Sequence, residues 1–255
     1  MGDSTFRKER ADAPPGFFGA EAAGLAWLAA AESRGGARIA RVVEAGDGHI
    51  VLERVEQVAP TRRAAEEFGR ALAATHRAGA SGFGAPPDGW DGPCFIGRQA
   101  LPTGSDRSWG AFYAELRLRP YADAALRIGN LDGDGYSAVR SVCDRLTAGE
   151  FDDQTPPARI HGDLWSGNVL FGRAGVVLID PAAHGGHRET DLAMLALFGA
   201  PELPAVLDSY AEAAPLDSGW RERIGLHQLH PLLVHAVSHG PSYGAEAGRV
   251  ARRYA

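Results

Sequence analysis

The fold is decided by the stretch His161-Gly-Asp-Leu-Trp-Ser-Gly-Asn168 together with the run Val176-Val-Leu-Ile-Asp180 that follows it. Two short apolar segments, residues 169–171 and 176–179, flank the turn residues Gly172-Arg-Ala-Gly175. Apolar runs separated by a glycine-containing turn are typical of a β-hairpin. The pattern therefore predicts a hairpin that returns Asp180, at the end of its second strand, to Asn168 at the start of its first.

This hairpin would bring an amide oxygen and a carboxylate together. Mg²⁺ prefers a few protein oxygens combined with substrate phosphates, so Asn168 and Asp180 suit a magnesium ion that arrives with a nucleotide. Asp163 precedes Asn168 by four intervening residues and stands where a base receives the proton of an attacking hydroxyl. A base followed by two metal ligands in this order is typical of phosphoryl transfer.

A purely structural interpretation competes with this one. Aspartate, glycine and asparagine are common in loops, and either half of the pattern alone would indicate turn chemistry. The complete spacing from Asp163 through Asn168 to Asp180 favours the catalytic interpretation.

Composition narrows the function classes further. The 255 residues carry a net charge of -6, which argues against nucleic-acid binding, where a basic excess is usual. Two cysteines are too few for a disulfide framework and fit a cytoplasmic protein. No run approaches eighteen apolar residues, so no membrane partner is expected. The basic and alanine-rich N-terminus is too interrupted by acidic residues and prolines for a secretory signal.

Local patterns predict a small α/β unit followed by a larger helical part. Strands are expected at residues 5–8, 38–43 and 49–55, and a helix at 18–33. Thr61 is a candidate N-cap for a helix that reaches Arg77, and residues 79–105 are expected to form a long loop. Further helices are expected at 109–126, 136–146, 191–198, 204–213 and 220–239.

One carboxylate in the first unit is informative. Glu21 shares a face of the 18–33 helix with Leu25 and Leu28, so it points to the side that packs and needs a partner there. Lys8, on the preceding strand, is the expected partner. A lysine that a glutamate positions against the nucleotide phosphates is typical of kinases. The alternative is that Glu21 only complements the helix dipole.

Taken together, these motifs resemble the fructosamine kinase (ketosamine 3-kinase) family, which is related to aminoglycoside and choline kinases. The resemblance covers nearly the whole chain, and its most specific parts are His161-Gly-Asp-Leu-Trp-Ser-Gly-Asn168, Asp180-Pro-Ala182 and Gly186-His-Arg-Glu189. It implies an α+β, two-lobed, protein-kinase-like (aminoglycoside phosphotransferase-like) fold. Residues 1–57 would form a truncated N-lobe, and residues 58–255 a mainly helical C-lobe with the catalytic loop and the metal-binding hairpin.

The resemblance also implies roles for single residues. The ATP site would comprise Lys8 on the phosphates, Glu21 orienting it, and the backbone of Glu53 to Val55 against adenine. Asp163 would be the base, Asn168 and Asp180 the Mg²⁺ ligands, and Asp191 a brace for the catalytic loop. The acceptor would be a sugar hydroxyl of a free or protein-bound ketosamine, with Trp165, His187, Arg188 and Glu189 as candidate contacts.

One departure from the family leaves alternatives open. Only seven residues precede Lys8, so the glycine-rich hairpin that covers the nucleotide phosphates is missing. Either the true start lies upstream or the chain is a degenerate relative, and a pseudokinase that binds nucleotide without turnover is the first alternative. The second is a metal-dependent hydrolase that uses His161, Asp163, Asp180, His184 and His187.

Other histidines have simpler interpretations. His235 and His239 lie four residues apart on one helix face, but without a third ligand they are expected to be packing or surface residues rather than a metal site. His76 is expected to be structural. The oligomeric state is open.

Overall fold

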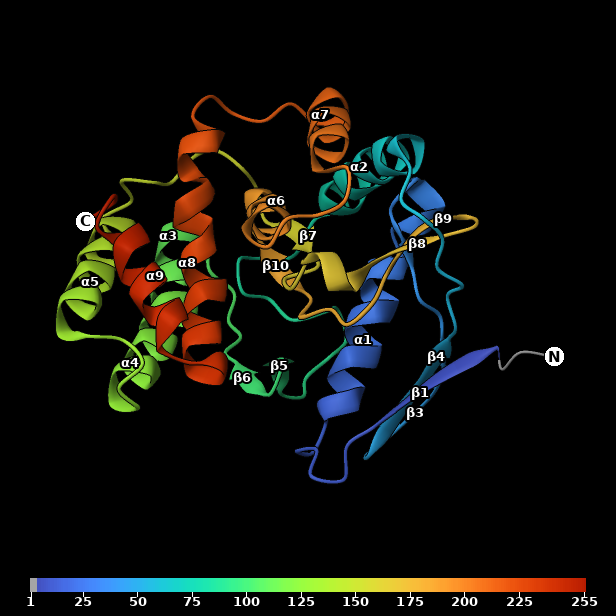
Figure 1. Cartoon of the computed structure of the whole chain (residues 1–255), viewed down its shortest axis with the longest axis horizontal. Helices are drawn as coiled ribbons and strands as arrows, with labels where there is room; N and C mark the ends of the chain where they lie inside the picture. Colours follow the sequence, from blue (N-terminus) through green and yellow to red (C-terminus); the bar gives the residue numbers. More distant parts are fainter. Residues whose placement is uncertain (1–3) are drawn as a thin grey trace.

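A computed structural model describes residues 4–255. Its first sheet has the order β1 (Thr5–Glu9), β4 (His49–Glu53), β3 (Val42–Gly46), and all neighbours are antiparallel. The centre of β4 is the apolar run Ile50-Val-Leu52, which is buried. Helix α1 (Phe17–Ala29) follows β1 and lies between this sheet and the middle of the molecule (Figure 1).

The predicted hairpin is confirmed. Strands β8 (Val169–Gly172) and β9 (Gly175–Leu178) are antiparallel, and Gly172 pairs with Gly175 at the turn. Strand β2 (Arg38–Ile39) joins β9 in parallel, so the strand predicted at 38–43 is wrong: residues 38–39 and 42–46 belong to different sheets. The parallel pairing joins segments far apart in the chain, and local β-propensity does not reveal such partners.

The helices enclose two apolar cores. One core lies between α1, β4, the β8–β9 hairpin, α2 (Arg62–Arg77) and α7 (Leu203–Ala213). Thr61 caps α2 as predicted, because its side chain accepts a hydrogen bond from the backbone N–H of Ala64 at 3.3 Å. The second core is formed mainly by helices and includes α3 (Trp109–Phe112), α4 (Arg119–Arg127), α5 (Gly133–Thr147), α8 (Trp220–His239) and α9 (Pro241–Ala251).

Two strands and a helix that flank residues 161–183 lie between the two cores. Strand β7 (Ala158–Ile160) pairs with β10 (His184–Gly186), and α6 (Arg188–Leu197) follows directly. Figure 1 shows the β1–β4–β3 sheet on one side of this central group and α4, α5, α8 and α9 on the other. None of the helices in residues 4–255 is long and apolar enough to cross a membrane.

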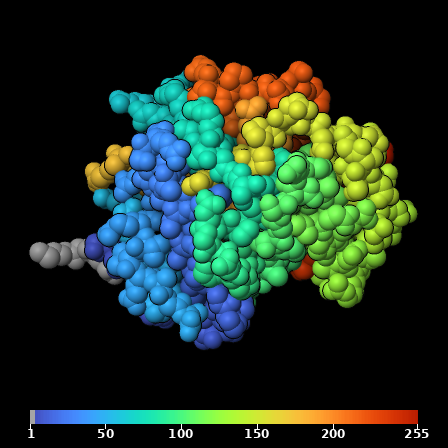
Figure 2. Space-filling view, turned by 180° about the vertical axis from the view of Figure 1, so that it is seen from behind, coloured from blue at the N-terminus to red at the C-terminus, as the bar shows by residue number. Residues whose placement is uncertain are grey.

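Several predicted boundaries were wrong. The segment expected to be a loop contains a hairpin of β5 (Cys94–Ile96) and β6 (Gln99–Leu101), which Figure 2 places in the teal-to-green surface between the two ends of the molecule. The helix predicted at 109–126 is not a continuous α-helix. A π-helical stretch, Tyr113–Leu118, interrupts that helix, and Pro120 lies in the first turn of α4, directly after this stretch.

Candidate active site

The β8–β9 hairpin brings the three predicted catalytic-segment residues together. Asn168 ends a short 3₁₀ turn, Ser166–Asn168, directly before β8, and its side-chain amide donates to the backbone oxygen of Asp163 at 2.8 Å. The same amide nitrogen lies 3.4 Å from the backbone oxygen of Asp180. Asp180 comes two residues after β9 and has a φ of 54°, a left-handed conformation that is uncommon for a residue with a side chain. Local strain of this kind is frequent at functional sites.

Lys8 and Glu21 form the predicted ion pair. The Lys8 ammonium donates to both Glu21 carboxylate oxygens, at 2.8 and 2.9 Å. It also donates to Asp180 Oδ1 at 2.8 Å, so β1, α1 and the end of the hairpin meet at one cation. Burial alone would lower the pKa of Lys8, but the two carboxylates outweigh it and raise this pKa above its usual value. Lys8 therefore stays charged at neutral pH.

Asp163 has the electrostatics of a proton acceptor. Burial raises the pKa of its carboxyl to about 7, and the nearby charge of Asp180 acts in the same direction. The hydrogen bond from Asn168 opposes both effects. A general base is most effective when its pKa lies near the working pH. Asp163 can thus accept a proton near neutral pH.

Asp191 holds the backbone of the catalytic segment. Its fully buried carboxylate accepts hydrogen bonds from the backbone N–H groups of His161 and Gly162, at 2.7 and 2.9 Å. His76 Nε2 lies 3.1 Å from the same carboxylate, and His76 Nδ1 lies 2.8 Å from the hydroxyl of Tyr210. The carboxylate thereby connects α2 and α6 to the two residues that precede Asp163.

A cleft of about 200 Å³ is lined by the residues predicted to bind the nucleotide phosphates, to hold the metal and to act as the base. Its lining includes Lys8, Glu21, Asp163, Trp165, Asn168 and Asp180. Glu53 and Val55 do not line it. The Glu53 carboxylate binds Arg38 at 3.1 Å, and Val55 lies beside Gly172 at the turn of the hairpin.

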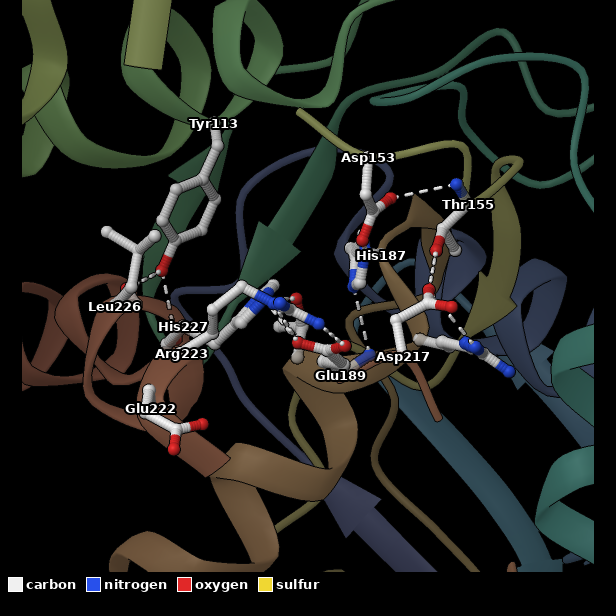
Figure 3. A network of polar contacts seen from close by, with 12 residues as sticks. Tyr113, Asp153, Thr155, His187, Glu189, Asp217, Glu222, Arg223, Leu226 and His227 are labelled. Carbon is white, nitrogen blue, oxygen red and sulfur yellow. Dashed lines mark hydrogen bonds and ion pairs between the residues drawn. The ribbon is translucent and has the colours of Figure 1, made fainter. Parts of the chain in front are cut away.

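His187, Arg188 and Glu189 do not line this cleft, and Figure 3 shows His187 and Glu189 in a separate polar network. His187 accepts a hydrogen bond from the N–H of Glu189 at 3.2 Å and contacts Asp153 at 3.2 Å. Arg188 lies 3.6 Å from Asp217. These residues connect the start of α6 to neighbouring segments, and we do not include them in the acceptor site.

Glu189 is also the centre of a cluster with metal-ligand character. His187, Glu189 and His227 offer ligand atoms within 4.8 Å of one another. The guanidinium of Arg223 already binds the Glu189 carboxylate, with Nε at 2.9 Å. Burial would raise the pKa of Glu189, but His227, whose Nε2 lies 3.4 Å away, and the hydrogen bonds from Arg223 hold it at about 2. An ion pair with arginine satisfies this carboxylate without a metal.

The histidines of the hydrolase alternative do not converge on the two aspartates. His161 Nε2 bonds to the backbone oxygen of Ile179 at 2.9 Å, and His184 Nδ1 bonds to that of Ala182 at 2.7 Å. Among residues 4–255, the cluster around Glu189 is the group that meets the spacing of metal ligands, and it contains neither Asp163 nor Asp180. The geometry speaks against that alternative.

The sequence did not predict a second pocket that lies beside Asp163. His235 and His239, expected to be packing or surface residues, line a larger pocket that also includes Asp163, Trp165 and Tyr243. The four-residue spacing of the two histidines was visible in the sequence. The sequence analysis did not predict α9, the helix that supplies Tyr243 and lies next to α8.

A family model described as fructosamine kinase matches residues 2–254. The chain belongs to the fructosamine kinase family. This family places it among the ATP-dependent phosphotransferases. A probable ketoamine kinase from Enterococcus faecium is 30% identical, over 98% of this chain and 87% of the relative.

Solved structures agree with this family. A protein from Thermobifida fusca, provisionally assigned as a fructosamine-3-kinase, is 47% identical with a TM-score of 0.88, covering 98% of this chain and 85% of that one. The aminoglycoside phosphotransferase APH(4)-Ia shares the fold, with a TM-score of 0.57 at 18% identity over 91% of this chain and 84% of that one. The predicted α+β fold of the aminoglycoside phosphotransferase and kinase type is therefore confirmed.

Proposed function

We propose that this fructosamine kinase family member transfers the γ-phosphoryl group of ATP to a sugar hydroxyl of a ketosamine, with Asp163 as the base. The carboxylate of Asp163 accepts the hydroxyl proton while the acceptor oxygen bonds to the γ-phosphorus. The bond from that phosphorus to the bridging oxygen breaks, and ADP leaves. The observation that carries this proposal is the meeting of Lys8, Asp163, Asn168 and Asp180 in one cleft.

Asn168 and Asp180 would hold Mg²⁺. The side-chain nitrogen of Asn168 is engaged by the backbone oxygen of Asp163, which leaves its amide oxygen as a possible ligand. An amide oxygen and a carboxylate are the hard donors that this ion prefers. When bound, Mg²⁺ neutralises charge on the phosphates.

Lys8 would bind the α- and β-phosphates, and Glu21 would fix its ammonium. In the structure Lys8 contacts Asp180 as well as Glu21, so the phosphate-binding cation already lies beside the proposed metal ligand. Asp191 acts as a positioning residue, because it fixes the backbone that leads to Asp163. Residues 1–57 supply Lys8 and Glu21 and residues 58–255 supply the rest, which supports the two-lobe division.

The test is mass-spectrometric detection of a phosphorylated product from Mg-ATP and a panel of fructose- and ribulose-amine adducts. Asp163→Asn should lower kcat by about 10²- to 10⁴-fold, the usual contribution of a general base, with ATP binding retained. Asp208→Asn makes the same chemical change at an exposed position of α7 and serves as the control. Full activity of Asp163→Asn would refute the assignment of the base. ATP binding without product from any adduct would favour the pseudokinase alternative.

A further inference from the structure

A second pocket adjoins the cleft across Asp163. It lies between the turn of the β5–β6 hairpin, the catalytic segment and the residues where α8 meets α9, and its volume is about 810 Å³. The pocket and the cleft share Gly97, Asp163 and Trp165. A base at the border of two spaces can face the phosphoryl donor in one and the acceptor in the other. The pocket is within the usual size range of small-molecule sites, and it has room for more than a sugar.

One wall of the pocket is a stack of aromatic rings. His235 packs against His239 and Tyr243, with ring centroids 4.9 and 5.0 Å from its own, and the Phe198 ring lies 5.1 Å from His235. His235 Nδ1 bonds to the backbone oxygen of Pro231 at 2.7 Å, which fixes the orientation of this ring. Burial lowers the pKa of His235, so this part of the wall is uncharged at neutral pH.

The lining of the pocket contains charged side chains of both signs. Asp163, the base itself, is the carboxylate in its lining, and Arg98 is the permanently charged cation there. Arg98 is exposed at the turn between β5 and β6. Among residues 4–255 its guanidinium makes no hydrogen bond or close ion pair, and its charge attracts the carboxylate of Asp12 over a longer distance. Asp12 itself is bonded to Arg10 at 3.0 Å.

Two further hydrogen-bond donors belong to the lining of the pocket. Within the described residues, neither the Tyr243 hydroxyl nor the indole N–H of Trp165 makes a hydrogen bond, and both side chains line the pocket. Among residues 4–255, the lining of the pocket contains free donors and an unpaired guanidinium but no carboxylate besides Asp163, and this composition suits an anionic group at the far end of the acceptor. Guanidinium and carboxylate groups match in geometry as well as in charge.

We propose that this pocket receives the amine portion of the acceptor and selects ketosamines whose amine portion carries a carboxylate, as in the sugar adduct of a free amino acid, with Arg98 as the partner of that carboxylate. The inference rests on the proposed function, since it extends the acceptor site of that reaction. The aromatic wall would then contact the carbon atoms between the amine and the carboxylate.

The experiment compares two fructose adducts of similar size, one of glycine and one of ethylamine, which lacks the carboxylate. The kcat/KM of the wild-type chain should be at least tenfold higher for the glycine adduct. Arg98→Gln should remove this preference by lowering kcat/KM for the glycine adduct alone. Arg98→Glu should reverse it toward the adduct of ethylenediamine, which carries an ammonium. Arg127→Gln, at an exposed position of α4, is the matched control and should keep the wild-type ratio.

Binding separates this inference from the proposed function. Calorimetry with Asp163→Asn measures acceptor affinity without turnover, and it should show the same preference for the glycine adduct. Equal affinity and equal kcat/KM for the two adducts would overturn the inference, as would a preference that survives Arg98→Gln. A binding preference without phosphorylation of either adduct would support the pocket assignment and refute the proposed reaction.

Discussion

Replacing Asp191 by asparagine should destabilise the protein and slow phosphoryl transfer, although Asp191 does not line the cleft. Its Oδ2 accepts from the N–H of His161 and lies near His76, while Oδ1 accepts from the N–H of Gly162. An asparagine keeps one oxygen and turns the other into an N–H₂ group. Whichever way this amide is oriented, one buried backbone N–H then faces a donor instead of an acceptor.

The size of the effect follows from that lost acceptor. Leaving a buried donor unsatisfied costs about 1–3 kcal/mol, and in a chain of this length each kcal/mol shifts Tm by about 2–4 °C. We therefore expect Asp191→Asn to lower Tm by about 2–12 °C. A displaced Gly162 backbone also moves Asp163, and a misplacement of about 1 Å can reduce the rate about 10²-fold.

The assay combines chemical denaturation with steady-state kinetics. The free energy of unfolding should fall for Asp191→Asn and stay within about 0.5 kcal/mol for Asp208→Asn, the surface control. The kcat should fall more than the KM for ATP changes, because Lys8 and Glu21 are untouched. The reasoning would be refuted if Asp191→Asn matched the control in both stability and kcat.

Three further predictions concern the base, the phosphate cation and the packing of α2. Asp163 accepts a proton only when ionised and its pKa is raised to about 7, so kcat/KM should fall as pH drops below about 7; a profile that stays flat down to pH 5 would contradict this. Lys8→Met should lower kcat/KM for ATP by at least tenfold, because it removes the cation between Glu21 and Asp180; unchanged ATP kinetics would argue against a phosphate role. Gly69→Ala should cost about 1–3 kcal/mol of stability by overpacking, since an added Cβ would lie 2.3 Å from the backbone oxygen of Val206; denaturation that matches the wild type would contradict it.

Local sequence signals predicted much of the fold. The β8–β9 hairpin, the Thr61 cap and the bounds of α8 follow from turn chemistry and periodicity, which act between near neighbours. Helix α9 was missed because its sequence, Pro241 to Ala251, contains two glycines, which have low helix propensity. Tertiary packing overcomes this cost, since Ala247, Val250 and Ala251 are buried in the helical core.

The contacts of the site also differ in whether a local sequence rule predicts them. The residues from Asp163 to Asp180 are close in sequence, so their spacing was enough to predict that they meet. The Lys8–Glu21 pair was also predictable, because a carboxylate on a packed helix face requires a nearby partner. No comparable local rule pairs His76 with Asp191, which lies 115 residues further along the chain.

The placement of His187, Arg188 and Glu189 shows where motif proximity misleads. These residues follow Asp180 closely in sequence, yet β10 carries the chain away from the cleft before α6 begins, and their side chains meet Asp153, Asp217 and Arg223 instead. Arg98 is the converse case, since it lies on a hairpin within a segment expected to be a loop and far in sequence from the catalytic residues. The proposed base and metal ligands therefore come from one compact segment, whereas Arg98, the proposed contact of the acceptor, comes from a separate element, and its place beside Asp163 is visible only in the folded chain.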